Sequence, residues 1–179
     1  MGFERIGSEE VWQGQIAGVR IDTVRYEDGA EATREVVSHP GAVAVVAHDG
    51  EHLFIVAQPR EPVGEQRLVE LPAGKLDEDG EDALATAKRE LAEEIGKGAR
   101  EWEHLVTFYS SPGFSDEQVH IFLATGLYEE PAEAGEEERI EVEAVPLADL
   151  DRLIADCRDA KSLIGLLWFR AYLLDADDH

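Results

Sequence analysis

The 179-residue sequence predicts an α/β sandwich built on a mixed sheet. Three observations carry this prediction. Strand patterns fill the first third of the chain, an amphipathic helix pattern lies in its middle, and two helical patterns close it. Because strands and helices are interleaved, and because the length suits one domain with a small appendage, a sandwich is favoured over an all-α or all-β fold.

The first strand patterns form a hairpin signal. Val19 to Tyr26 alternates apolar and polar residues, Asp28-Gly29 supplies a turn, and Glu31 to Val37 returns. Alternation of this kind around an Asp-Gly pair is typical of two antiparallel strands joined by a tight turn. A small antiparallel β element is therefore expected at the N-terminus.

The main sheet is predicted from apolar runs of strand length. Ala42 to Ala47 is continuously apolar, and Leu53 to Ala57 follows after an Asp-Gly turn. A run that is apolar at every position indicates a strand buried on both faces, so Ala42 to Ala47 is expected at the centre of the sheet. Val106 to Tyr109 and Val119 to Leu123 are further strand candidates.

Three helices are expected. In Glu81 to Ile95, the apolar residues recur at spacings of three and four, Glu81 and Asp82 suit the positive end of a helix, and Gly96 is a common stop signal. Leu147 to Cys157 and Lys161 to Leu174 are the two closing helices. The acidic stretch from Glu129 to Arg139 is expected to be a loop.

Composition narrows the possible partners. The chain carries 16 basic and 40 acidic residues, a net charge of −24, which argues against binding to nucleic acid or to an anionic membrane surface. A phosphate-bearing small molecule remains compatible, because divalent metal ions can reverse the local charge. With one cysteine, Cys157, no signal-peptide pattern and no long apolar run, a cytoplasmic protein is expected.

The acidic face of the central helix is the main candidate for chemistry. Glu90 and Glu94 are four residues apart and share one face, with Glu93 beside them, while Arg89 is spaced to pair with Glu93. Clustered carboxylates suit a hard divalent cation such as Mg²⁺ or Mn²⁺, and the bend at Pro72-Ala73-Gly74 could add a backbone carbonyl. The alternative is a solvated acidic face in a protein rich in carboxylates.

A known motif covers these residues. Glu81, Arg89-Glu90-Leu91, Glu93-Glu94 and Gly96 stand at the spacings of the Nudix box, which this segment resembles. The segment departs from the motif in having six residues rather than five between Gly74 and Glu81, and in having Lys97 at the final apolar position. The resemblance implies a Nudix-type α/β/α sandwich and a metal-dependent hydrolase.

Further segments resemble the ADP-ribose pyrophosphatase subfamily. These are the Ser-Pro-Gly segment from Ser110 to Glu117, Gln58-Pro59-Arg60, and the stretch from Arg34 to Val43. The resemblance runs from about Val11 to Leu174. It implies an N-terminal β-hairpin domain over residues 1–38 that dimerises, a Nudix hydrolase domain over 39–179, and a homodimer.

The resemblance also implies residue roles. It assigns the metal to Ala73, through its carbonyl, and to Glu90, Glu93, Glu94 and Glu138. It assigns the general base to Glu136 or Glu137, with Arg89 orienting the carboxylates. Substrate contacts fall to Arg60 for the diphosphate, to Arg34 and Glu35 for the adenine bound by the other subunit, and to Ser111, Pro112, Gly113 and Glu117 for the terminal ribose.

Three functions are therefore compatible with parts of this pattern. The first is Mg²⁺-dependent hydrolysis of ADP-ribose to AMP and ribose 5-phosphate. The second is hydrolysis of another nucleoside diphosphate derivative, such as an ADP-sugar, a nucleotide sugar, NADH or FAD. The third is a non-catalytic ADP-ribose sensor that regulates transcription, which would require a degraded box and a basic DNA-binding domain; the intact box and the charge of −24 argue against it.

Overall fold

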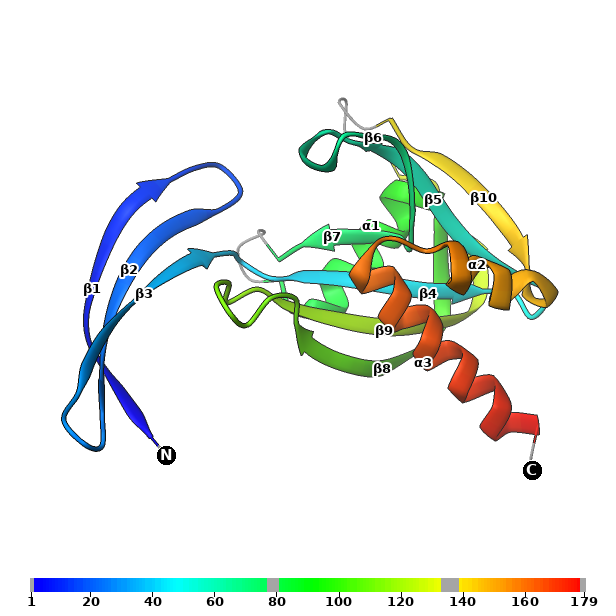
Figure 1. Cartoon of the computed structure of the whole chain (residues 1–179). Helices are drawn as coiled ribbons and strands as arrows, with labels where there is room; N and C mark the ends of the chain where they lie inside the picture. Colours follow the sequence, from blue (N-terminus) through cyan, green and yellow to red (C-terminus); the bar gives the residue numbers. More distant parts are fainter. Residues whose placement is uncertain (1, 77–80, 133–138, 178–179) are drawn as a thin grey trace. The chain divides into compact units, whose positions relative to one another are not determined.

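The computed structural model describes residues 2–76, 81–132 and 139–177, which form two compact units (Figure 1). The first unit comprises the chain up to Gly41 together with Phe108–Gln118. The second comprises Ala42–Thr107 and the chain from Val119 onward. Among the described residues, no helix is long and apolar enough to cross a membrane.

The first unit holds a three-stranded antiparallel sheet rather than the expected two-stranded hairpin. Strand β2 (Gly18–Tyr26) lies between β1 (Phe3–Gln13) and β3 (Glu31–Ser38). The predicted pair corresponds to β2 and β3, joined through the expected turn. The sequence gives no sign of β1, because β1 is exposed along its whole length and its apolar residues do not alternate regularly.

The second unit is built on a seven-stranded mixed sheet, which confirms the predicted fold class. Its order is β10-β5-β4-β9-β8, with β6 added beside β5 and β7 beside β4. Strand β4 runs parallel to β9 and antiparallel to β5 and β7. The bounds are β4 Ala42–His48, β5 His52–Arg60, β6 Glu65–Glu70, β7 Ala73–Lys75, β8 Lys97–Tyr109, β9 Gln118–Glu129 and β10 Glu141–Pro146.

Several of these strands differ from expectation. Strands β8 and β9 are much longer than the predicted Val106–Tyr109 and Val119–Leu123, because polar residues on their exposed positions mask the strand pattern. Strand β6 has no apolar run and was not predicted. The bend at Pro72 is present, but Ala73 and Gly74 then form β7 instead of a free loop.

The core lies on both faces of β4, as the apolar run predicted. Val43, Val45 and Ala47 are fully buried and pack with Leu91 of α1 (Ala83–Ile95) in one cluster. On the opposite face, the fully buried Phe169 of α3 (Ala160–Asp177) packs against the His48 ring, with 4.9 Å between the ring centroids. Figure 1 shows α3 in front of the sheet and α1 behind it, which is the expected sandwich.

The helix ends follow local capping chemistry. Helix α1 begins two residues later than expected because the Asp82 side chain caps it, accepting a hydrogen bond from the Ala85 amide at 2.8 Å. It ends at Gly96, whose φ of 69° is left-handed. The predicted helix over Leu147–Cys157 divides into a 3₁₀ turn at Leu147–Asp149 and α2 at Leu150–Asp156. A second 3₁₀ turn, Glu61–Val63, links β5 to β6.

Candidate functional site

Two buried carboxylates define the candidate site. Glu90 and Glu94 lie one turn apart on α1, and each is only 8% exposed. Carboxylates are rarely buried without partners, because desolvation of the charge is costly. Both lie on the side of α1 that contacts β7, so the face singled out by the four-residue spacing is a buried one and not a solvated acidic face.

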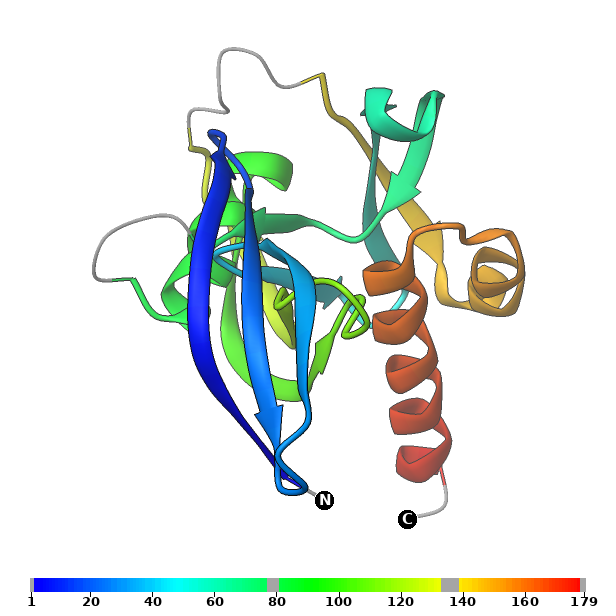
Figure 2. The same ribbon diagram turned by 60° about the vertical axis from the view of Figure 1, so that its left-hand side comes forward.

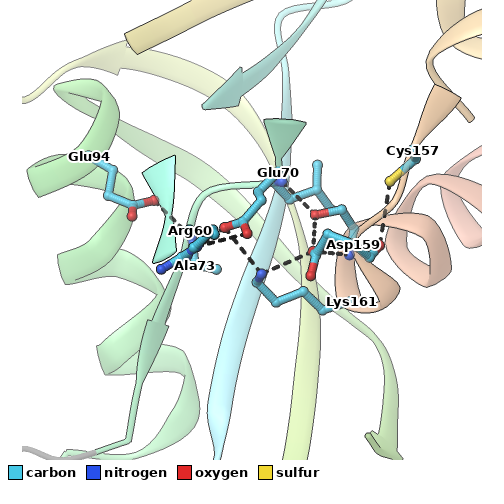
Figure 3. Close-up of polar contacts among 9 residues, drawn as sticks. Arg60, Glu70, Ala73, Glu94, Cys157, Asp159 and Lys161 are labelled. Atoms are coloured by element: carbon cyan, nitrogen blue, oxygen red, sulfur yellow. Dashed lines mark hydrogen bonds and ion pairs between the residues drawn. The ribbon is translucent and has the colours of Figure 1, made fainter. Parts of the chain in front are cut away.

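Glu94 is tied to the backbone of β7. The amide of Ala73 donates a hydrogen bond to Glu94 Oε2 at 2.8 Å, and Figure 3 shows the carboxylate pointing toward Ala73. A backbone donor stabilises the ionised form of a carboxylate. The contact therefore fixes a carboxyl group beside the Pro72-Ala73-Gly74 segment, which the sequence predicts as part of the metal site.

Gly74 gives Glu90 its space. A Cβ atom built on Gly74 would lie 1.9 Å from Glu90 Cδ and 2.0 Å from Glu90 Oε1. No side chain can be added there without displacing the carboxylate. This close approach of backbone and glutamate is the reason for a glycine at position 74.

We expect Gly74→Ala to lower kcat about tenfold, because the added methyl group pushes the Glu90 carboxylate out of place. Steady-state kinetics at increasing concentrations of divalent cation checks this. Lys88→Ala is the control, since Lys88 is an exposed residue of the same helix. Normal turnover and normal metal dependence in Gly74→Ala would rule out the assigned role of Glu90.

Arg89 is the counter-charge of the cluster. Its Nη1 donates to Glu90 Oε1 at 2.8 Å and to Glu93 Oε2 at 2.9 Å, and its Nε donates to Glu81 at 3.2 Å. Burial opposes the charge of Arg89, but these three carboxylates outweigh it and raise its pKa above the ordinary value. Its Nη2 is buried and has no hydrogen-bond partner among the described residues. The Arg89–Glu93 pair expected from the four-residue spacing is present, and the orienting role of Arg89 stays a prediction.

The donor set suits a divalent cation. Carboxylate oxygens are the ligands that Mg²⁺ and Mn²⁺ prefer, and Glu90 and Glu94 present them from one helix face beside the close backbone at Gly74. Within the described ranges, no three His, Cys, Asp or Glu side chains are already gathered around a common point for a metal. Arg89 contacts both Glu90 and Glu93, and its single positive charge offsets only part of the negative charge of this cluster.

Arg60 lies at the end of β5 and is held by Glu70. Arg60 Nε donates to Glu70 Oε1 at 2.9 Å, and Nη2 donates to Glu70 Oε2 at 2.5 Å. The hydrogen bonds to Glu70 are the largest cause of a raised pKa at Arg60, and they outweigh the opposite effect of burial. Lys161 also contacts Glu70. The sequence predicts Arg60 as a site residue but not Glu70 or Lys161, because these residues meet Arg60 only through the pairing of β5 with β6 and the position of α3.

Two predicted substrate residues lie on β3. Arg34 is exposed, and it donates to the Tyr26 hydroxyl at 2.6 Å and to the Thr33 carbonyl at 2.7 Å. Glu35 is its exposed neighbour. Their proposed contact with adenine stays a prediction.

The predicted ribose-binding segment is an ordered turn in the first unit. Ser111, Pro112 and Gly113 form its tip, and the Ser111 carbonyl accepts from the amides of Phe114 and Ser115. Glu117 is held by the Ser110 hydroxyl at 2.5 Å and lies 3.4 Å from His39 Nδ1. Neither Ser110 nor His39 was predicted as a support of Glu117.

The three glutamates of the acidic stretch, Glu136, Glu137 and Glu138, lie outside the described residues, so their roles stay predictions.

Comparison with known proteins decides the family. A sequence model of the NUDIX domain matches residues 37–164. The chain belongs to the Nudix family. It is 41% identical over 170 residues to an ADP-ribose pyrophosphatase of Bacillus subtilis, covering 92% of this chain and 91% of that one. It is 46% identical over 155 residues to an ADP-ribose pyrophosphatase of Mycobacterium tuberculosis, covering 85% and 74% of the two chains.

A solved structure supports the Nudix fold. An ADP compounds hydrolase superposes with a TM-score of 0.85, covering 98% of this chain and 96% of that chain, at 23% sequence identity. At this identity the likeness speaks for the fold alone. The structural likeness confirms the predicted fold class, while the family match and the two pyrophosphatases confirm the recognition of the Nudix box and the expectation of a Nudix hydrolase, a family that generally uses divalent cations.

Proposed function

We propose that this Nudix hydrolase cleaves the diphosphate of ADP-ribose to AMP and ribose 5-phosphate with Mg²⁺, with Mn²⁺ as a possible substitute. The observation that carries the chemistry is the pair of buried glutamates on α1, Glu90 and Glu94, beside the close backbone of Gly74. The choice of substrate is supported by identities of 41% and 46% to two ADP-ribose pyrophosphatases over most of the chain.

Charge is the central difficulty of this reaction. A diphosphate is negative and repels hydroxide, and this chain adds a net charge of −24. A bound divalent cation supplies charge neutralisation and lowers the pKa of a coordinated water. Glu90, Glu93, Glu94, Glu138 and the Ala73 carbonyl are the residues proposed to hold it. Arg89 keeps the carboxylates oriented.

Arg60 is proposed to bind the diphosphate, since a guanidinium matches the geometry of phosphate oxygens. A carboxylate from the acidic stretch, Glu136 or Glu137, is proposed as the general base that accepts a proton from the attacking water. Ser111, Pro112, Gly113 and Glu117 are proposed to line the terminal ribose, and Arg34 and Glu35 the adenine of the other subunit's substrate.

A panel of substrates tests the proposed specificity. ADP-ribose, ADP-glucose, NADH and FAD are assayed with Mg²⁺ and with Mn²⁺, and kcat/KM is compared across the panel. We expect ADP-ribose to give the highest value. A clear preference for another compound would favour the second reading, hydrolysis of a different nucleoside diphosphate derivative by the same site.

A homodimer is also proposed, with residues 1–38 as the dimerisation domain. Strand β1 is exposed throughout, and Phe3, Val11 and Trp12 are 70%, 57% and 57% exposed. Exposed apolar residues gathered on one small sheet are typical of a surface that another chain covers. Three strands without a helix also bury little apolar area of their own.

We expect light scattering to give the mass of a dimer at assay concentration, and Trp12→Glu to shift the protein toward the monomer with loss of activity. The charged side chain would have to be desolvated in the interface, which opposes association. Glu9→Gln, a change on the same strand that introduces no charge, serves as control. A monomer with full activity would contradict both the dimer and the role of Arg34 in the neighbouring site.

A further inference from the structure

Behind Arg60 lies a chain of alternating charges that no local sequence pattern predicts. Figure 3 shows Arg60, Glu70, Lys161 and Asp159 in succession. Lys161 Nζ lies 3.3 Å from Glu70 Oε2 and 3.0 Å from Asp159 Oδ2. Glu70 is only 2% exposed, so this carboxylate is buried between two cations.

The geometry of the Arg60–Glu70 pair leaves part of Arg60 available. Glu70 engages Nε and Nη2, which form one edge of the planar guanidinium. A guanidinium has five N–H donors, so the remaining edge with Nη1 can still donate to an anion. A two-point contact also fixes the plane of the group, which a single contact would leave free to rotate.

The other end of the chain is anchored in the fold. Asp159 caps α3, because its Oδ2 accepts from the Ser162 amide at 2.9 Å and from the Ser162 hydroxyl at 2.6 Å. The Ser162 hydroxyl oxygen in turn accepts from the Leu71 amide at 2.7 Å. These bonds join the start of α3 to the residue that follows Glu70. Lys161 therefore reaches Glu70 from a fixed position.

Arg60 lies close enough to the α1 carboxylates to be affected by the charge of Glu94. The negative charge of Glu94 contributes to the raised pKa of Arg60, after the contributions of Glu70. In the view of Figure 3, Arg60 is drawn between Glu94 and Glu70. A diphosphate bound at the Glu94 site would thus be within reach of the guanidinium.

We propose that Glu70 is a positioning residue for the diphosphate: it holds one edge of Arg60 so that the other edge faces the substrate, and Lys161 holds Glu70. The inference rests on the proposed function, since it deepens the role of Arg60 at that site. Neither Glu70 nor Lys161 needs to touch the substrate. The alternative is that the pair only stabilises the fold.

Glu70→Gln tests the inference. The amide keeps the shape but loses the charge and one acceptor, so Arg60 is no longer fixed at two points. We expect KM for ADP-ribose to rise about tenfold while kcat changes little, because the contact holds substrate and transition state alike. Glu143→Gln is the control. It removes another carboxylate that pairs with an arginine, Arg67, on the same sheet, and it should leave KM unchanged.

A double-mutant cycle separates positioning from stability. If Glu70 acts through Arg60, adding Glu70→Gln to Arg60→Lys should raise KM no further, since lysine cannot make the two-point contact. Lys161→Met should raise KM less than Glu70→Gln does, and it also serves as the probe if Glu70→Gln does not fold. Melting temperatures are recorded for every variant.

The outcomes are distinguishable. A wild-type enzyme that does not turn over ADP-ribose would overturn the proposed function. Turnover in the wild type, with Glu70→Gln lowering only the melting temperature, would overturn the inference alone. The inference alone would also be overturned if the increases in KM of Arg60→Lys and Glu70→Gln multiplied in the double variant. If Glu70→Gln cannot be prepared, an unchanged KM in Lys161→Met would overturn it.

Discussion

Replacing Glu94 by glutamine is expected to lower turnover about a hundredfold or more, because the site loses a charge that organises the metal. The substitution removes the charge of the side chain and keeps its size and shape. The glutamine oxygen can still accept the hydrogen bond of the Ala73 amide, so the contact between α1 and β7 is retained while the charge is removed. Measurements of kcat across a titration with Mg²⁺ should show lost turnover and weakened metal binding in a folded protein.

Glu129→Gln is the control for this experiment. Glu129 is 81% exposed and pairs with Lys97 at 2.7 Å on the surface, a contact of the kind that contributes little to stability. Its removal should leave both turnover and metal dependence unchanged. Near-normal kcat with unaltered metal affinity in Glu94→Gln would remove Glu94 from the metal site.

The second large effect is expected in the acidic stretch. One of Glu136→Gln and Glu137→Gln should lower kcat by about 10²–10⁴-fold, the range for loss of a general base, while the other is far milder. Only one carboxylate can face the attacking water. Metal and substrate affinity should change little. We favour Glu137 as the base because it lies nearer in sequence to the following strand, β10.

Glu117→Gln is the variant with which Glu136→Gln and Glu137→Gln are compared. It is fixed by Ser110 and lies beside His39, and its predicted role is in binding, so Glu117→Gln should weaken substrate binding more than chemistry. Single-turnover kinetics at saturating Mg²⁺ on all three variants separates these effects. If Glu117→Gln alone slowed the chemical step, the base would belong to the Ser-Pro-Gly segment and not to the acidic stretch.

The elements predicted from sequence are those with local signals. Strand β4 was found because every residue from Ala42 to Ala47 is apolar, and α1 because its apolar spacing, its capping Asp82 and its terminal Gly96 agree. The site residues on α1 follow from the same periodicity, since a helix fixes which side chains share a face. The resemblance to the Nudix box then gave these residues a chemistry.

The elements that were missed depend on distant partners. Strand β6 carries polar residues, and its place is set by pairing with β5. The register sets Glu70 opposite Val56 and Arg60 opposite Glu65, so the Arg60–Glu70 contact is made by two side chains that reach along the strands and not by residues directly opposite each other. Lys161 reaches Glu70 from the other end of the chain. No local pattern contains this information.

The most direct test of the central claim is product analysis of ADP-ribose hydrolysis in oxygen-18-labelled water, with and without added Mg²⁺. We expect AMP and ribose 5-phosphate in equal amounts, with the label in a phosphate group of one product, and no reaction after the divalent cation is chelated. Cleavage that persists without a divalent cation, or label that enters neither phosphate group, would contradict metal-dependent attack of water on phosphorus.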